Sequence, residues 1–379
     1  MQFIQHDQHS IFFTSFASPS AGASCIMAPK KAAKVYDYTG LTAGVTLQAE
    51  SAGSWYAAEV VTVSESPKRV KAPVKVHFKG YDNSSDEWLG GDRIRSKALK
   101  VKTPEKKRIF SLPDQVARFA RAKEEKNERY LNIASVYKAD DWKGKKVLVV
   151  GASRGLGLML AKKLVEDGAE PIVTCRRTNA ELEAVEAKQI ITAVEVTSME
   201  SLTKMCEAIT GPLDYIIYVA GIFPDVVDNL DNIQEQAAMD QFSVCGFGPV
   251  RCVGALKAAN LLKGAKVAII SSQAGSAQWR FTQNKDKGSD YGHHMCRAAC
   301  NIAIALMSEE LKKDDVPIVA LHPGFNRTTM TEKYKHFWDI EGAVPPEEGA
   351  MRVLHETASI SMKTSGQFIN CEDGLRIPF

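Results

Sequence analysis

The chain has 379 residues, of which 45% are hydrophobic and 25% are charged. This composition is typical of a globular protein, and the length predicts two or three domains. No apolar run approaches the roughly 18–20 residues of a membrane span, so we expect no membrane partner. Residues 1–145 carry 24 Lys and Arg against 16 Asp and Glu, whereas the remainder carries 24 against 29. This asymmetry predicts two modules with different partners.

The cysteines indicate a reducing compartment. The 8 cysteines include no Cys-x-x-Cys pair, and no further Cys or His spacing completes a zinc set around Cys296 and Cys300. We therefore expect reduced thiols, no metal site, and an intracellular location that is cytoplasmic or nuclear.

The N-terminal segment shows no pattern of regular structure. Residues 1–26 lack Lys and Arg, which is unlike a transit peptide. Met27 begins a Met-Ala-Pro-Lys-Lys segment that reads like an alternative start. We expect residues 1–30 to be disordered or dispensable.

Residues 35–100 are expected to form a small β-barrel. Apolar residues alternate over 55–63 and again over 74–78, which is the period-2 pattern of half-buried strands. Further short strands are expected up to residue 95. Five short strands in about 60 residues favour a barrel.

The segment Val76-His-Phe-Lys-Gly-Tyr-Asp-Asn-Ser-Ser-Asp-Glu-Trp88 resembles the chromo-barrel and Tudor-knot family. In that family an aromatic cage binds a methylated lysine through cation–π attraction. The resemblance implies a cage at Tyr56, Phe78 and Tyr81, with Trp88 in the core and Ser85 where a further aromatic often stands. Two alternatives stay open: the aromatics merely form the core of the domain, or the domain binds RNA as some relatives do.

Residues 101–144 are expected to be a basic linker followed by a helical connector. The stretch from Arg93 to Arg108 contains eight Lys and Arg residues, among them Lys106 and Lys107, and a single acid, Glu105. This stretch could contact phosphates, serve as a nuclear address, or be a solvated linker. Residues 113–137 have a helical pattern of apolar and charged side chains.

Strands alternate with helices over residues 145–379. Strands are expected at 146–151, 171–175, 189–195, 214–220, 265–271, 316–321 and 366–370, and helices at 155–168, 199–209, 232–262, 290–313 and 346–358. The alternation predicts the α/β class, with a doubly wound parallel sheet (Rossmann fold) covered on both faces.

One loop of this module predicts nucleotide binding. A buried strand runs directly into Gly151-Ala-Ser-Arg-Gly-Leu-Gly157 and then into a helix. Such a turn leaves backbone N–H groups free at the helix N-terminus for a pyrophosphate, and glycines let the backbone approach it. The residues expected to bind the cofactor here are Gly151, Ser153, Arg154, Gly155, Leu156 and Gly157.

Residues 145–379 resemble the short-chain dehydrogenase/reductase family. Besides the glycine loop, the matching motifs are Tyr218-Val-Ala-Gly221, Ile269-Ile-Ser-Ser272, the Pro-Gly loop from Leu321 to Met330, and the strand from Gly366 to Gly374. The resemblance implies an oxidoreductase for a small carbonyl or alcohol substrate. It implies a homo-oligomer through the helices at 232–262 and 290–313, and it places Ala220, Gly221, Pro323, Gly324 and Thr328 at the cofactor.

The cofactor is predicted to be NADP(H). After the second strand, the run Thr174-Cys-Arg-Arg177 offers no carboxylate for a ribose 2′-hydroxyl. Arg176, with Arg177 beside it and Arg154 in the loop, could instead pair with a 2′-phosphate. The alternative is that Arg176 and Arg177 are solvated surface charges. The family resemblance places Glu195 near the adenine.

The catalytic positions depart from the family's Ser, Tyr, Lys and Asn. Ser272 matches the serine, whereas the best register has His293 at the tyrosine, Arg297 at the lysine and Cys245 at the asparagine. In one interpretation the module is an active oxidoreductase with His293 as substitute acid beside Arg297, or with Tyr291 reaching the substrate. In the other it is a catalytically silent NADP(H)-binding scaffold or sensor, with the barrel as its reader.

Overall fold

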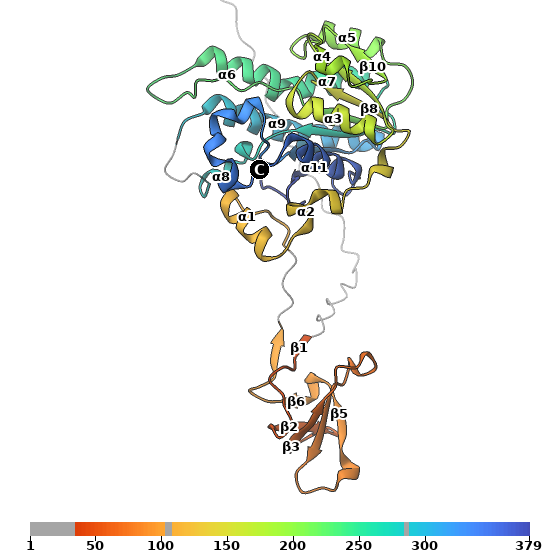
Figure 1. The fold of residues 1–379 in the computed structure, drawn as a ribbon, viewed down its shortest axis with the longest axis vertical. Helices are drawn as coiled ribbons and strands as arrows, with labels where there is room; N and C mark the ends of the chain where they lie inside the picture. Colours follow the sequence, from red (N-terminus) through yellow and green to blue (C-terminus); the bar gives the residue numbers. More distant parts are fainter. Residues whose placement is uncertain (1–34, 103–107, 284–287) are drawn as a thin grey trace, which may run out of the picture. The chain divides into compact units, whose positions relative to one another are not determined.

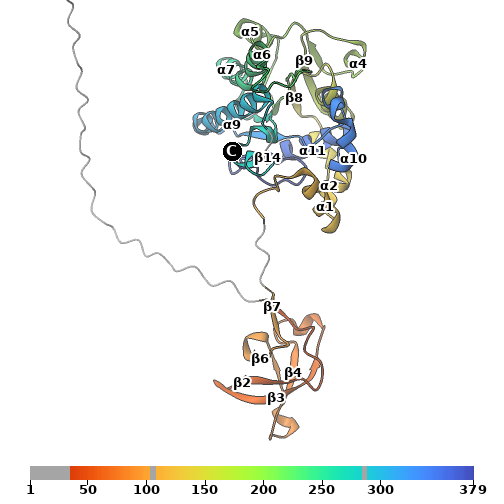
Figure 2. The same ribbon diagram turned by 90° about the vertical axis from the view of Figure 1, so that its left-hand side faces the viewer.

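The computed structural model describes residues 35–102, 108–283 and 288–379. They belong to two compact units, Met1–Lys107 and Arg108–Phe379 (Figure 1; Figure 2). The predictions for residues 1–30 and for a start at Met27 fall outside the described residues, as do Lys106 and Lys107. No helix within the described ranges is long and apolar enough to cross a membrane.

The first unit contains an antiparallel sheet of five strands in the order β5-β4-β3-β2-β6. Its buried face follows the alternation of the sequence, because Val74, Val76 and Phe78 are buried and the residues between them are not. The strands are β2 (Thr46–Ser51), β3 (Ser54–Val63), β4 (Val74–Phe78), β5 (Glu87–Leu89) and β6 (Ile94–Arg95), and β1 (Val35–Asp37) pairs separately with β7 (Lys100–Lys102).

Closure of this sheet into a barrel stays a prediction, because β5 and β6 each pair with one neighbour among the described strands. The expected core position of Trp88 is wrong. Its side chain is half-buried, with the Arg69 guanidinium carbon 4.5 Å from the ring centroid, whereas Leu89 is fully buried in the core. Successive side chains of a strand point to opposite faces, and in β5 the inward position belongs to Leu89.

The helix expected over residues 113–137 is instead two shorter helices, α1 (Gln115–Glu124) and α2 (Glu128–Leu131). The break comes at Lys126, whose φ of 51° is incompatible with a right-handed helix. Both helices lie in the second unit, where α1 contacts α10 (Trp338–Glu341).

The second unit is built on a parallel sheet of seven strands in the order β10-β9-β8-β11-β12-β13-β14 (Figure 1). This order, with the first strand of the unit in the middle, is that of a doubly wound Rossmann fold, so the predicted α/β class is confirmed. The strands are β8 (Lys146–Val150), β9 (Glu170–Thr174), β10 (Gln189–Ile191), β11 (Tyr215–Tyr218), β12 (Lys266–Ile270), β13 (Ile318–His322) and β14 (Phe368–Asn370).

Helices cover both faces of the sheet, and each face has its own hydrophobic core. Leu148 and Val150 of β8 face one core, and Val147 and Val149 face the other, since strand residues alternate between faces. The first core includes residues of α5 (Met199–Glu207), α7 (Gly248–Ala258) and α9 (Tyr291–Leu311), and the second includes residues of α3 (Gly155–Glu166) and α11 (Pro346–Ala358).

The long helix expected over residues 232–262 is interrupted. It consists of α6 (Glu235–Gln241), a π-helical turn at Phe242–Phe247, and α7. The Tyr218 hydroxyl donates to the Val244 carbonyl oxygen at 2.7 Å within this turn. Turns of this kind are frequent at functional sites, and this one contains Cys245.

Short helices occupy segments in which the sequence has no periodic pattern. They are α4 (Ala180–Glu183), α8 (Ala277–Arg280), the 3₁₀ segment Thr329–Phe337, and α10. The three α-helices have four residues each, and the 3₁₀ segment is kinked at Tyr334, so none of them establishes a 3.6-residue repeat that the sequence could reveal.

Candidate active site

The glycine loop lies at the carboxyl end of β8, against the segment that follows β11. Gly151 has φ of 100°, and a Cβ on it would lie 2.6 Å from the Cα of Ala220. A Cβ on Gly157 would lie 2.2 Å from the carbonyl oxygen of Gly151. Both positions therefore require glycine. Arg154 precedes α3 without capping it through its side chain, so the first N–H groups of that helix are available to an anion.

Arginines flank this loop. Arg154, Arg176 and Arg177 are all exposed. The Asn179 Nδ2 donates to the Ser153 carbonyl oxygen at 2.7 Å, which ties the segment after β9 to the glycine loop. Glu195 lies beyond β10, where its carboxylate accepts the Thr197 N–H and hydroxyl at 3.2 and 3.0 Å.

The Pro-Gly loop after β13 approaches the glycine loop from the other side. Its Thr328 methyl group lies 3.9 Å from the position that a Cβ of Gly155 would take. Thr328 also begins the 3₁₀ segment, in a capping box with Thr331. Two of the residues expected at the cofactor therefore lie against the glycine loop: Thr328 beside Gly155, and Ala220 beside Gly151.

Arg297 lies buried in the middle of the site. Its Nη1 donates to the Ile270 carbonyl oxygen at 3.0 Å, and its Nη2 lies 3.1 Å from the position of a Cβ on Gly221. Its Nε has no hydrogen-bond partner among the described residues. Ser272 follows Ile270 closely, and its hydroxyl accepts the Ala274 N–H at 3.2 Å. Arg297 and Ser272 therefore both lie at the carboxyl end of β12.

His293 lies one turn before Arg297 on α9, on the same face of the helix. Its ring packs edge-on against Phe223, with the centroids 4.7 Å apart, and its buried Nδ1 has no partner within the described ranges. Burial, and next the Arg297 charge, hold the pKa of His293 well below its ordinary value. The imidazole is therefore neutral near pH 7, and it is a hydrogen-bonding group rather than a ready proton donor.

Tyr291 is the first residue of α9, and its hydroxyl lies 3.9 Å from the position of a Cβ on Gly288 in the preceding loop. Two residues along a helix turn a side chain by about 200°, so Tyr291 and His293 leave α9 in different directions. The structure groups His293 with Arg297 and directs Tyr291 elsewhere.

Cys245, which is expected at the asparagine position of the family, lies beside a second thiol, Cys296. Its sulfur accepts the Ile222 N–H at 3.4 Å and donates to the Ile222 carbonyl oxygen at 3.6 Å. It also interacts with the Cys296 thiol, which donates to the His293 carbonyl oxygen at 3.2 Å. The Cys296 hydrogen bond, opposed by burial and helped by the Arg297 charge, lowers the pKa of Cys245, and the pKa of Cys296 is raised. The buried guanidinium therefore lies near a thiol whose pKa it helps to lower. No group of three or more His, Cys, Asp or Glu in the described part of the chain is arranged to hold a metal.

The surroundings of His293 include Phe223, Lys333 and Tyr334, which no motif of the sequence marked as site residues. The Lys333 Nζ lies 3.8 Å from the ring centroid of Phe223 and donates to the Pro224 carbonyl oxygen at 2.9 Å. The ring of Tyr334 is 6.5 Å from that of Phe223, centroid to centroid. These side chains come from the loop after β11 and from the 3₁₀ segment after β13, so only the tertiary fold brings them together.

A buried ion pair holds the loop after β13 in place. Glu372 accepts hydrogen bonds from Arg118 Nε at 3.1 Å and Gln115 Nε2 at 2.8 Å, both on α1, and from the Phe325 N–H at 3.3 Å. Burial alone would raise the pKa of Glu372, but the charges of Arg118 and Arg352 lower it to about 2. The carboxylate stays ionised and ties α1 to the Pro-Gly loop.

In the first unit, Tyr56, Phe78 and Tyr81 lie together. The ring centroid of Tyr56 is 6.0 Å from that of Phe78 and 6.1 Å from that of Tyr81, and both pairs are edge-on. Phe78 is buried, whereas Tyr56 is 37% and Tyr81 55% exposed. The group is therefore an aromatic surface above the core, and Ser85 close by in the sequence is exposed.

Comparison with known proteins agrees with this architecture. Residues 145–337 match the family model of the short chain dehydrogenases. The chain is 28% identical over 225 residues, 59% of its length and 94% of the relative, to 1-hydroxy-2-glutathionyl-2-methyl-3-butene dehydrogenase of Rhodococcus sp. (strain AD45). It is 27% identical over 235 residues, 57% of its length and 85% of the relative, to a benzil reductase of Saccharomyces cerevisiae.

Solved structures show the same fold. The NADPH-bound carbonyl reductase from chicken fatty liver superposes with a TM-score of 0.53 at 23% identity, covering 62% of this chain and 100% of that one. Carbonyl reductase Sniffer of D. melanogaster superposes with a TM-score of 0.52 at 21% identity, with 62% and 100% covered. The strand order, the glycine loop and the family match together establish that the chain belongs to the short-chain dehydrogenase family.

Proposed function

We propose that residues 145–379 form an NADP(H)-dependent oxidoreductase for a small carbonyl or alcohol substrate, with an atypical catalytic site. The observation that carries the proposal is the cradle at α3, where Gly151 and Gly157 have no room for a side chain and the helix N-terminus is uncapped. Exposed Arg176 supplies the charge for a 2′-phosphate. The NADPH-bound carbonyl reductase of similar fold supports the same cofactor.

The cofactor roles follow from the positions around this cradle. We assign the pyrophosphate to the glycine loop and the 2′-phosphate to the arginines, with Glu195 near the adenine. The residues proposed to bind NADP(H) are Gly151, Ser153, Arg154, Gly155, Leu156, Gly157, Arg176, Arg177, Glu195, Ala220, Gly221, Pro323, Gly324 and Thr328. When bound, NADP(H) supplies or accepts the hydride.

The catalytic residues of this proposal are Ser272, His293 and Arg297, with Tyr291 as the alternative proton donor. Ser272 hydrogen-bonds the substrate oxygen, and neutral His293 accepts the proton of an alcohol during oxidation. Burial, and next the fixed charge of Arg297, keep His293 unprotonated. In carbonyl reduction His293 must first be protonated. Because its pKa is low, little of it is protonated near pH 7, and the rate of reduction is limited more than the rate of oxidation.

Calorimetric titration of the full chain with NADPH and with NADH tests the cofactor assignment. We expect NADPH to bind more tightly, and Arg176→Ala to weaken NADPH binding about tenfold while leaving NADH unchanged, because one charge-assisted contact is lost. Exposed Lys263, before the amino end of β12, provides the matched control Lys263→Ala. Equal loss for both cofactors would contradict the role of Arg176.

Turnover of carbonyl and alcohol panels separates the enzyme from the second candidate, a silent NADP(H)-binding scaffold or sensor. That candidate is favoured by the packing around His293, where Phe223 lies against the imidazole and Lys333 and Tyr334 lie against Phe223. Activity that falls in His293→Ala identifies the acid–base residue, and a fall in Tyr291→Phe alone identifies the tyrosine. NADPH binding without turnover, unaffected by either variant, would favour the scaffold.

For the first unit we propose a chromo-barrel-like domain that binds a methylated lysine peptide. The exposed, mutually perpendicular rings of Tyr56 and Tyr81 support this, since a quaternary ammonium is attracted to aromatic faces. Fluorescence titration with a trimethyl-lysine peptide should give binding that is lost in Tyr56→Ala and absent for the unmodified peptide. Binding of a single-stranded RNA instead, unaffected by Tyr56→Ala, would favour the RNA-binding alternative.

A homo-oligomer through α9 is the remaining proposal. Met295, Ile302 and Leu306 are 61%, 59% and 62% exposed and lie at helical spacing along α9. Light scattering should give more than one chain per particle, and Ile302→Glu should shift the mass towards the monomer. A monomer at high protein concentration would contradict the proposal.

A further inference from the structure

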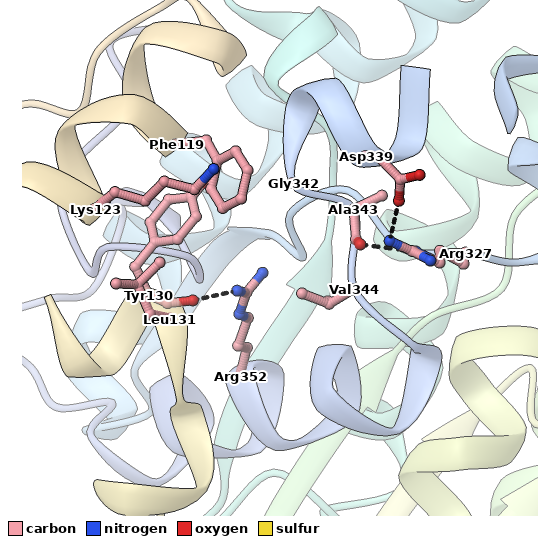
Figure 3. Close-up of a pocket in the computed structure, with 10 residues that line it drawn as sticks. All are labelled: Phe119, Lys123, Tyr130, Leu131, Arg327, Asp339, Gly342, Ala343, Val344 and Arg352. Atoms are coloured by element: carbon pink, nitrogen blue, oxygen red, sulfur yellow. Dashed lines mark hydrogen bonds and ion pairs between the residues drawn. The ribbon is translucent and has the colours of Figure 1, made fainter. Parts of the chain in front are cut away.

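A pocket of about 260 Å³ opens in the second unit, and no residue of the glycine loop lines it (Figure 3). The connector helices α1 and α2 form one wall and the segment after α10 forms the other, with α11 below. Its principal lining residues are Phe119, Lys123, Tyr130, Arg327, Val344 and Arg352. The volume equals that of roughly nine waters at ~30 Å³ each, which accommodates a small organic molecule.

Arg352 is the unusual feature of this pocket. Its side chain is 1% exposed, and in Figure 3 its guanidinium rises from α11 between Tyr130 and Val344. Its Nη2 donates to the Tyr130 carbonyl oxygen at 2.5 Å, but its Nε and Nη1 have no hydrogen-bond partner among the described residues. Two buried donors of a charged group without hydrogen-bond partners cost folding free energy. A bound ligand that accepts hydrogen bonds from them would offset this cost.

The nearest carboxylate does not satisfy Arg352. Glu372 Oε1 is 4.0 Å from Nη1, beyond hydrogen-bond distance, and it already accepts from Gln115 and from the Phe325 N–H. The other Glu372 oxygen accepts from Arg118. Arg352 is thus paired with Glu372 by charge alone, and its Nε and Nη1 donate hydrogen bonds to no acid among the described residues.

The remaining charges of the lining also favour an anion. Lys123 stands over the Phe119 ring at 3.8 Å. Arg327 bonds Asp339 at 2.8 Å, and Asp339 is the single acid of the lining. Three cations thus face one carboxylate. Phe119 and Tyr130 stack with their centroids 6.2 Å apart, so an apolar surface lies beside the cations.

We propose that this pocket binds the oxyanion group of a small apolar acid, a carboxylate or a phosphate monoester. The oxyanion pairs with Arg352 at the base, and the apolar body lies against Phe119, Tyr130 and Val344. A bound ligand would also contact the segment from Asp339 to Val344. This segment follows the 3₁₀ segment whose Lys333 lies against Phe223. The pocket is thus a ligand site outside the cofactor cradle.

Ligand-detected NMR on the full chain tests the proposal with benzoate, phenyl phosphate and neutral benzamide as probes. We expect saturable binding of an oxyanion on the order of millimolar, in keeping with so small a ligand, and none of benzamide. Arg352→Met should weaken binding at least about tenfold, since charge-assisted hydrogen bonds are lost. Tighter binding of benzoate identifies a carboxylate site, and tighter binding of phenyl phosphate identifies a phosphate site.

Two further variants keep the test decisive if Arg352→Met does not fold. Val344→Phe fills the pocket and retains every charge, so it should also abolish oxyanion binding. Lys123→Ala alters an exposed side chain and should weaken binding about twofold. Lys263→Ala, an exposed change before the amino end of β12, is the control and should bind the probes as the parent chain does. Absence of saturable oxyanion binding, equal binding of benzamide, or full binding by folded Val344→Phe would overturn the proposal.

Discussion

Replacing Glu372 by Gln is expected to destabilise the second unit strongly. The change keeps the size of the side chain and removes the charge that Arg118 and Arg352 face, both with side chains 1% exposed. Removing one partner of a buried ion pair leaves an uncompensated charge in a low-dielectric interior and costs about 3–5 kcal/mol. At about 2–4 °C per kcal/mol for a unit of this size, the loss is roughly 10 °C in Tm.

Calorimetry of the full chain over a range of pH measures this loss. The pKa of Glu372 is about 2 in the folded chain, below its ordinary 4.5, so its contribution is fully present above pH 4.5 and is lost as the pH falls towards 2. The free energy of unfolding of the parent chain should therefore exceed that of Glu372→Gln by a roughly constant amount from about pH 6 to 8. This difference should shrink below about pH 4.5.

Hydrogen exchange and a surface control complete the test. The amides of α1 should exchange faster in Glu372→Gln, because Gln115 and Arg118 anchor α1 to this carboxylate. Glu207→Gln, an exposed change at the end of α5, should stay within about 0.5 kcal/mol of the parent chain. A loss below about 1 kcal/mol at pH 7, or one that does not diminish in acid, would refute the reasoning.

Three other predictions follow from the site. The rate of carbonyl reduction should fall as the pH rises through the neutral range, because protonated His293 becomes scarcer above its lowered pKa, and His293→Ala should flatten the profile. Arg297→Met should raise the pKa of Cys245, which the ultraviolet absorbance of the thiolate followed against pH would reveal, with Cys245→Ser as the blank. Gly157→Ala should abolish NADPH binding measured by calorimetry, since the added Cβ would lie 2.2 Å from the Gly151 carbonyl oxygen; undiminished binding would contradict the geometry of the cradle.

The strands and long helices of the second unit were predictable because their signal is local. Buried parallel strands are continuous apolar runs, and the glycine loop lies within seven consecutive residues, Gly151 to Gly157. The interruptions were not predictable in this way. The break at Lys126 depends on a left-handed backbone, and the π turn around Cys245 accompanies a hydrogen bond from Tyr218 on another element.

The sequence by itself determined the Rossmann architecture and the glycine loop at the end of its first strand, since these depend on residue identity and spacing along the chain. The tertiary structure decided which side chains come into contact. Three contacts join segments far apart in the sequence: Cys245 near Arg297, Lys333 against Phe223, and Arg352 beneath Tyr130. Burial and charge pairing depend on three-dimensional neighbours, so no pattern along the chain encodes them.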